Sequence, residues 1–173
     1  MGELKHLAKH LIDESVLNSP LIIAAFLNAD RKYFVPPNQK AFTYYDTALP
    51  IGFDQTISQP FTVAFLLEKL QSRKNQKILD IGSGSGWTTA LLAYITGSGG
   101  RIIGLERLQE LVKFGQSNLQ KYNFPWVKIL KSSSKLGYPK EAPYDRILVS
   151  AAASQVSDEL LGQLAPTGRL VMP

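Results

Sequence analysis

The chain has 173 residues, and 45% of them are hydrophobic, which is the size of one domain with enough apolar side chains for a core. No apolar run reaches the roughly 18 residues of a membrane-spanning helix, and the N-terminus lacks the apolar stretch of a signal peptide, so we expect a protein with no membrane partner. The absence of cysteine excludes disulfides, thiolate zinc sites and a cysteine nucleophile, and we expect a cytoplasmic protein on the same ground. The net charge of +5 is interpreted as solvated loops and helix ends, because no aromatic side chains interleave with the basic residues to stack nucleic-acid bases. We therefore expect no nucleic-acid partner.

Residues 1–75 predict helices on either side of an irregular segment. His6 and His10 lie one turn apart on the N-terminal helix and are interpreted as surface residues, so no metal site is expected. Ser19 and Pro20 have the residue types of a helix N-cap and first helical position. The apolar positions of the helix that follows recur at helical spacing: Ile22, Ala25, Phe26 and Ala29. The helix that Pro60 opens has the same pattern at Val63, Leu66, Leu67 and Leu70. Residues 31–60, rich in proline and aromatic residues, are expected to be ordered but irregular and functional.

Residues 76–173 alternate short apolar runs with helical stripes. The expected strands cover residues 77–81, 101–106, 126–130, 146–150 and 169–172. Helical stripes follow the first two strands, and a further helix is expected after Ser157 with Leu160, Leu161 and Leu164 on its apolar face. This alternation predicts an α/β fold, a doubly wound, mostly parallel sheet of the Rossmann-like type. We expect a single domain, with residues 1–75 as an N-terminal extension and residues 76–173 as the cofactor-binding core.

A glycine-rich loop joins the first of these strands to a helix. Its residues are Gly82, Ser83, Gly84, Ser85 and Gly86. Trp87 replaces the final glycine of the dinucleotide-binding pattern, and Asp80 precedes the loop, where it would repel a pyrophosphate but suit a cationic amino acid. Glu106 ends the second strand, where an acid can accept hydrogen bonds from ribose hydroxyls. The combination favours S-adenosylmethionine, with S-adenosylhomocysteine as its product, over NAD.

Several segments identify a family resemblance. Residues 49–60 read LPIGFDQTISQP, preceded by FVP at residues 34–36. Similar matches follow in the same order: residues 142–145, 151–153 and 163–171. Over residues 16–173 the chain resembles the protein-L-isoaspartate O-methyltransferases, and QTISQP is more selective than the glycine loop. The resemblance implies methylation of the free carboxylate of L-isoaspartyl residues in damaged proteins or peptides, which is a step of protein repair.

The resemblance also implies roles in the QTISQP segment. Ser58 is expected to lie beside the reacting carboxylate and to donate a hydrogen bond to it, while Thr56, Ile57 and Gln59 hold the isoaspartyl backbone. Ser58 has a second interpretation, as the N-cap of the Pro60 helix. The two are compatible, because a helix N-terminus favours an anion.

The sequence departs from the family pattern in three places. Asp54 stands where the family usually has glycine, so its carboxylate either repels an anionic substrate or faces solvent. Residues 132–134 are three serines where the family has Gly-Asp-Gly, so we expect Ser133 to replace the acid that meets the adenine amino group. The family also continues beyond the position of Pro173. Residues 169–172 are therefore expected to form an exposed edge strand through which the chain self-associates, with poor activity.

Two alternatives to this function remain open at the level of sequence. One is a methyltransferase acting on RNA or a small molecule, which the positive charge favours and QTISQP opposes. The other is a degenerate S-adenosylmethionine-binding domain without turnover, which the serine run and the early end favour.

Overall fold

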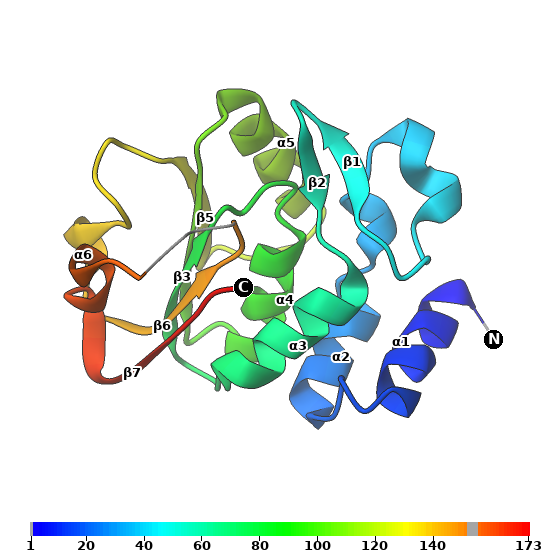
Figure 1. The fold of residues 1–173 in the computed structure, drawn as a ribbon, viewed down its shortest axis with the longest axis horizontal. Helices are drawn as coiled ribbons and strands as arrows, with labels where there is room; N and C mark the ends of the chain where they lie inside the picture. Colours follow the sequence, from blue (N-terminus) through cyan, green and yellow to red (C-terminus); the bar gives the residue numbers. More distant parts are fainter. Residues whose placement is uncertain (1, 152–155) are drawn as a thin grey trace.

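A computed structural model describes residues 2–151 and 156–173 (Figure 1). Its centre is a sheet of five parallel strands in the order β5-β4-β3-β6-β7. The strands are β3 (Lys77–Ile81), β4 (Arg101–Glu106), β5 (Val127–Lys131), β6 (Tyr144–Val149) and β7 (Leu164–Val171). In chain order, the sheet begins with β3 at its centre and continues through β4 to β5 at one edge. The chain then returns to β6 on the other side of β3, and β7 lies beside β6. The predicted doubly wound α/β fold is confirmed.

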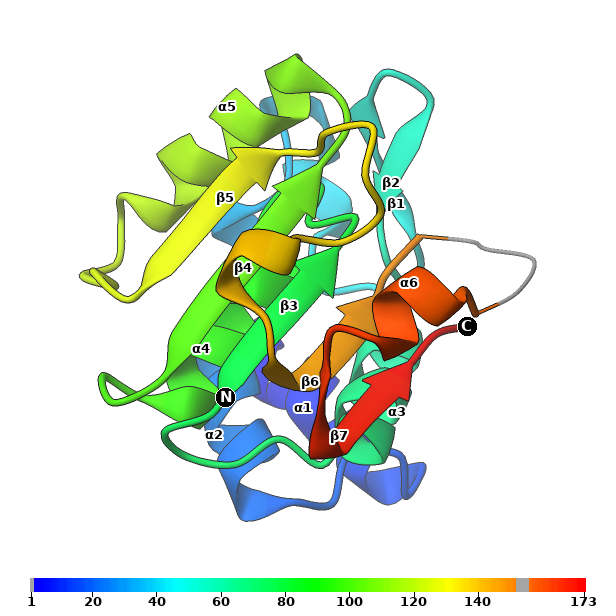
Figure 2. The same cartoon turned by 90° about the vertical axis from the view of Figure 1, so that its left-hand side faces the viewer.

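The two faces of the sheet are covered by different sets of helices. Alternate residues of the strands point to opposite faces, so Ile78 joins one apolar cluster and Leu79 joins the other. In Figure 2, α6 (Asp158–Leu161) and the short 3-10 helix η3 (Pro139–Glu141) lie on the near face, and the remaining helices lie behind the sheet. The far face is covered by α3 (Pro60–Leu70), α4 (Trp87–Thr96) and α5 (Gln109–Leu119). The sheet is therefore buried on both sides, as near-continuous apolar strands require.

The N-terminal helices form an outer layer on α3 and α4. These are α1 (Glu3–Asp13) and α2 (Pro20–Asn28), which Figure 1 places on the side away from α6. The predicted apolar face of α2 is confirmed, since all four of its residues are at most 3% exposed. The predicted Ser19 N-cap has no capping bond: its hydroxyl instead donates to Glu68 of α3 at 2.6 Å. In the part of the chain that the structure describes, no helix is long and apolar enough to cross a bilayer.

Residues 31–60 are more regular than the sequence analysis expected. They contain two 3-10 helices, η1 (Arg31–Tyr33) and η2 (Pro37–Phe42), and an antiparallel hairpin of β1 (Leu49–Gly52) and β2 (Gln55–Ile57). The hairpin turn is Phe53-Asp54, with φ of +56° and +55°. Two residues in the left-handed region give the turn the twist that hairpins favour. The prediction of an irregular segment was wrong here, because the turn lacks the Asn-Gly or Asp-Gly signal.

The end of the chain differs from the prediction at two points. Ser157 caps α6 as predicted, with its hydroxyl accepting from the Leu160 amide at 3.3 Å. However, Leu164 lies in β7, paired with Tyr144 of β6, and not on the helix. β7 therefore begins five residues before the predicted strand and contains a register shift. It lies at the edge of the sheet in the described part of the chain, and self-association through it stays a prediction.

A close approach between α5 and the glycine loop positions the cofactor side of the fold. A Cβ placed on Gly115 of α5 would lie 3.0 Å from the Gly84 carbonyl oxygen and 2.8 Å from Ile129 of β5. The contact with Ile129 is shorter than real Cβ contacts and the contact with the Gly84 oxygen is tighter than most, so a larger residue would force the Ile129 side chain, and also the loop or the helix, to move. Gly115 thus sets how closely α5 supports the loop.

We predict that Gly115→Ala destabilises the fold by about 1–3 kcal/mol, as overpacking typically does, despite the better helix propensity of alanine. Denaturant unfolding would measure the loss, with Ser117→Ala on the exposed side of the same helix as the control. Equal stability in the two variants would show that the contact is loose.

Candidate active site

A cavity of about 580 Å³ opens at the carboxyl ends of the parallel strands. The hairpin and the segment directly after it form one wall, through Asp54, Gln55, Thr56 and Ser58. The other walls come from segments that follow the strands: Ile81, Gly82, Gly84, Leu105, Glu106, Arg107, Leu108, Leu111, Ser132, Ser150 and Ala151. Ligands of open α/β sheets bind at this edge. A hollow of similar size lies along β5, but none of the predicted site residues lines it.

The glycine loop turns through three positive φ angles, +84° at Gly82, +50° at Gly84 and +85° at Gly86. Gly82 and Gly84 line the cavity as predicted, whereas Gly86 is buried against α5. Ser83 and Ser85 are also buried, at 5% and 3% exposure, and border a small adjoining recess instead of the main cavity. The backbone of the loop, and not its two serine hydroxyls, therefore faces a ligand.

Glu106 lines the cavity with its carboxylate already held. One oxygen accepts from the Gly84 amide at 3.0 Å, and the other accepts from the amides of Arg107 and Leu108 at 2.7 and 3.0 Å. A carboxylate oxygen can accept further bonds beyond these. The predicted acid at the end of the second strand is thus fixed before any ligand arrives, in a place where ribose hydroxyls can donate to it.

We predict that Glu106→Ala weakens S-adenosylhomocysteine binding by about 1–3 kcal/mol, the usual effect of losing charge-assisted hydrogen bonds. Titration calorimetry would measure it against Glu110→Gln, an exposed acid on the first turn of α5. Equal affinity in the wild type and in Glu106→Ala would remove this carboxylate from the site.

Asp80 does not face the cavity, which differs from its predicted contact with the cofactor. The side chain is 0% exposed, and its carboxylate accepts from Thr89 at 2.7 Å and from Ser150 at 3.1 Å. Burial raises the pKa of Asp80 to about 6, while the two hydroxyl bonds oppose the rise. Any effect of Asp80 on a ligand is therefore indirect and passes through Ser150, which lines the cavity.

The raised pKa of Asp80 gives a pH dependence of stability with a defined sign. The folded chain holds this proton more tightly than the unfolded chain, so the stabilisation is present below the ordinary pKa of 3.8 and is lost as pH rises through about 6. Relative to Asp80→Asn, the wild type should lose on the order of 2–3 kcal/mol of unfolding free energy between those pH values. Urea unfolding of both proteins across that range would measure it. A difference that does not change with pH would contradict the shift.

Two serines that line the cavity at strand ends were not among the predicted site residues. Ser132, directly after β5, lines the cavity, whereas the predicted Ser133 is exposed and its hydroxyl accepts from the Lys135 amide at 3.2 Å. Ser132 would therefore be nearer to a bound ligand in this structure, and the adenine contact of Ser133 stays a prediction. Ser150, directly after β6, lines the cavity and two recesses beside it, and was not predicted. Its position at the carboxyl end of a predicted parallel strand was the available signal.

The acceptor segment presents only some of its predicted residues to the cavity. Thr56 and Ser58 line it, Ile57 is 4% exposed and packs into the core, and the Gln59 side chain turns away to donate to Asp46. Ser58 is not the N-cap of α3, because Gln59 occupies that position and the Asp46 carboxylate accepts from the Phe61 amide at 2.8 Å. The alternative role of Ser58 as a cap is thus wrong.

Asp54 lies at the tip of the hairpin, exposed, on the rim of the cavity. Its φ of +55° explains why glycine suits this position, since glycine has no Cβ to clash in the left-handed region. Aspartate tolerates that region better than most residues. Repulsion of an anionic substrate by this carboxylate stays a prediction.

The chain is similar to known proteins over nearly all of its length. The sequence profile of the Protein-L-isoaspartate(D-aspartate) O-methyltransferase family matches residues 2–173. The chain is 41% identical over 170 residues to the protein-L-isoaspartate O-methyltransferase of Methanopyrus kandleri, a match that covers 98% of this chain and 75% of that one.

Two solved structures are similar over the whole chain. A protein-L-isoaspartate O-methyltransferase matches with a TM-score of 0.88 and 26% identity, over 98% of this chain but only 55% of its own length. The protein-L-isoaspartate O-methyltransferase from Plasmodium falciparum, in complex with S-adenosyl-L-homocysteine, matches with a TM-score of 0.86 and 26% identity, over 100% of this chain and 84% of that one. Both likenesses extend over the N-terminal helices and the hairpin as well as the sheet.

Proposed function

We propose that this chain, which belongs to the protein-L-isoaspartate(D-aspartate) O-methyltransferase family, transfers a methyl group from S-adenosylmethionine to the free carboxylate of L-isoaspartyl residues in proteins or peptides. One observation carries the proposal: the hairpin residues of QTISQP and the glycine loop line the same cavity. The acceptor and the methyl donor can therefore meet without a rearrangement of the fold. Isoaspartyl-containing proteins are the partners that follow from this activity.

The residues of the cavity fit S-adenosylmethionine. The Glu106 carboxylate would accept bonds from ribose hydroxyls, and the backbone at Gly82 and Gly84 leaves room for a ligand to approach closely. Ser132 lies beyond Glu106 along the strand ends, where the base would lie. When bound, the sulfonium cofactor supplies an activated methyl group with a neutral leaving group.

The chain's own part in the reaction is to position the acceptor. A carboxylate is ionised at neutral pH, so no general base has to remove a proton from it. Ser58 lies between the hairpin and α3 with no hydrogen bond to its hydroxyl among the described residues, so this hydroxyl is available to donate to one carboxylate oxygen. The other oxygen can then point toward the methyl group. Holding the reacting atoms in line accounts for most of the rate that such a site can supply.

The decisive assay measures methyl transfer to an isoaspartyl hexapeptide, its aspartyl twin and bulk RNA. The proposal predicts transfer to the isoaspartyl peptide in clear preference to both. Transfer to RNA would support the alternative methyltransferase, and binding of the cofactor without transfer to any acceptor would support a degenerate binding domain.

We predict that Ser58→Ala lowers kcat for the isoaspartyl peptide by about 10- to 100-fold, the range for a lost positioning bond, while the affinity for S-adenosylhomocysteine stays within about threefold. Ser117→Ala, a hydroxyl deletion on the exposed face of α5, is the control. Wild-type turnover in Ser58→Ala would show that the hydroxyl has no part in the reaction.

A further inference from the structure

Ser58 and Gln59 lie in a short segment with no regular structure. β2 ends at Ile57 and α3 begins at Pro60, whose ring nitrogen has no hydrogen to donate. Neither a strand ladder nor a helix turn therefore fixes the Ser58 backbone. Its position has to come from side chains elsewhere in the chain.

Arg31 of η1 supplies one of these anchors. It is the largest fully buried side chain in the described residues, and its guanidinium group donates only to backbone carbonyl oxygens. The acceptors are those of Thr43 at 2.8 Å, Tyr45 at 3.3 Å, Thr47 at 2.9 Å and Ser58 at 3.0 Å. One planar cation thus ties the loop before the hairpin to the acceptor residue itself.

Trp87 connects the same guanidinium group to the cofactor side of the cavity. The carbon centre of the Arg31 guanidinium lies 5.3 Å from the centre of the Trp87 ring, within the range of a cation–π contact. The indole nitrogen of Trp87 donates to the Ala29 carbonyl at 2.9 Å, which holds the ring against the segment that carries Arg31. Trp87 directly follows the glycine loop. Arg31 therefore lies between the loop that faces the cofactor and the residue that faces the acceptor.

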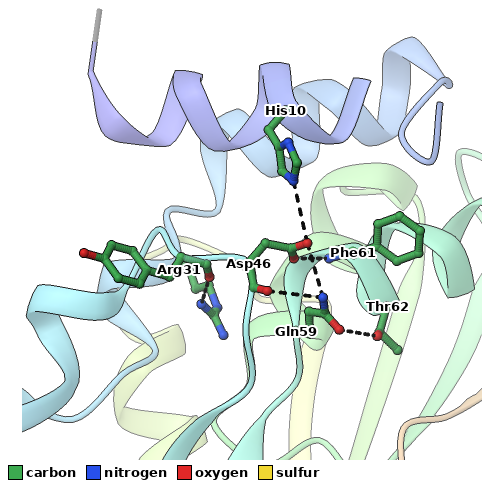
Figure 3. A network of polar contacts seen from close by, with 7 residues as sticks. His10, Arg31, Asp46, Gln59, Phe61 and Thr62 are labelled. Atoms are coloured by element: carbon green, nitrogen blue, oxygen red, sulfur yellow. Dashed lines mark hydrogen bonds and ion pairs between the residues drawn. The ribbon is translucent and has the colours of Figure 1, made fainter. Parts of the chain in front are cut away.

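Asp46 anchors the next residues, as Figure 3 shows. One carboxylate oxygen accepts from the Phe61 backbone amide at 2.8 Å, and the other accepts from the side-chain nitrogen Nε2 of Gln59 at 3.2 Å. His10 of α1 approaches the second oxygen at 3.9 Å. The start of α3 and the side chain after Ser58 are thus held by one carboxylate from the loop that Arg31 ties down.

We propose that Arg31 is a positioning residue, which together with Asp46 fixes Ser58 at a set distance from the glycine loop. The proposal rests on the proposed function, since it assigns Ser58 to the acceptor. It also explains why the chain has Trp87 where dinucleotide-binding loops end in glycine: the ring forms one side of the Arg31 site.

Arginine fits this position for two physical reasons. Its fork of five donors can satisfy four carbonyl oxygens that converge from different segments, and a lysine ammonium has only three donors and no plane to stack on the indole. Burial lowers the pKa of Arg31 to about 10, opposed by Asp46, so the group stays charged at neutral pH. A charged donor strengthens each of the carbonyl bonds.

The test compares Arg31→Lys with Arg146→Lys. Arg146 is a matched control because it is also buried, at 9% exposure, and donates to the carbonyl oxygens of Leu70, Gln71 and Asp145, away from the acceptor segment. Three readouts are needed at a temperature where both variants are folded: kcat and KM for the isoaspartyl hexapeptide, calorimetric affinity for S-adenosylhomocysteine, and amide hydrogen exchange over residues 55–63.

Arg31→Lys should lower kcat by about 10- to 100-fold and speed exchange over residues 55–63, with cofactor affinity within about threefold of the wild type. Arg146→Lys should leave kcat and that exchange close to the wild type. Equal losses in both variants, or no change in Arg31→Lys, would overturn the proposal.

Two further measurements cover the cases in which Arg31→Lys does not fold or the wild type is inactive. If Arg31→Lys does not fold, Asp46→Ala replaces it, with Asp46→Asn as the conservative variant that keeps an oxygen for the Phe61 amide and should restore turnover. If the wild type does not methylate the isoaspartyl peptide, the proposed function fails, whereas exchange over residues 55–63 still decides whether Arg31 and Asp46 fix the segment.

Discussion

The Arg31 guanidinium is the interaction on which the acceptor side of this fold depends. It collects carbonyl oxygens from residues 43–47 and from Ser58, and it stacks on the first residue after the glycine loop. A buried cation is costly unless it is hydrogen-bonded. The two terminal nitrogens of Arg31 find four carbonyl acceptors, while its Nε has no hydrogen-bond partner among the described residues, so a shift of the surrounding backbone would leave further donors without acceptors. The energetic penalty of burial therefore acts as a constraint on geometry.

On the cofactor side, a buried anion is held by backbone groups in the same way. Glu106 accepts from three backbone amides, one of them in the glycine loop. These bonds fix the position of the loop relative to the end of β4. Asp80 lies behind the loop and binds two hydroxyls without facing the cavity. Charged groups on both sides of the cavity are thus held mainly by backbone and hydroxyl groups, and the cavity between them is preorganised for a reaction that needs alignment more than proton transfer.

The sequence predicted the parts of the structure that local patterns determine. β3 and β4 have the predicted bounds, because buried parallel strands read as short apolar runs between turn residues. The glycine loop and Glu106 follow or end a strand, as predicted for the same reason, while their contacts with a cofactor stay predictions. The hairpin was missed, since Phe53-Asp54 adopts its left-handed turn without a glycine in either central position.

Contacts between distant segments were beyond the reach of sequence patterns. Arg31 and Ser58 are 27 residues apart, and nothing in either neighbourhood indicates that one holds the other. Ser132 and Ser133 are neighbouring residues of the same type, and only the path of the chain after β5 decides that Ser132 lines the cavity. Asp80 was assigned to the ligand from charge alone, whereas its depth in the sheet decides that it binds Thr89 and Ser150.

We propose that one cavity aligns the acceptor carboxylate, held by Ser58, with a methyl donor held by the glycine loop and Glu106. A crystal structure of the chain with S-adenosylhomocysteine and an isoaspartyl peptide would show this arrangement. We expect the ribose hydroxyls on Glu106, and one peptide carboxylate oxygen within hydrogen-bond distance of the Ser58 hydroxyl, with the other facing the cofactor sulfur. Cofactor in this cavity with the peptide carboxylate bound away from Ser58 would contradict it.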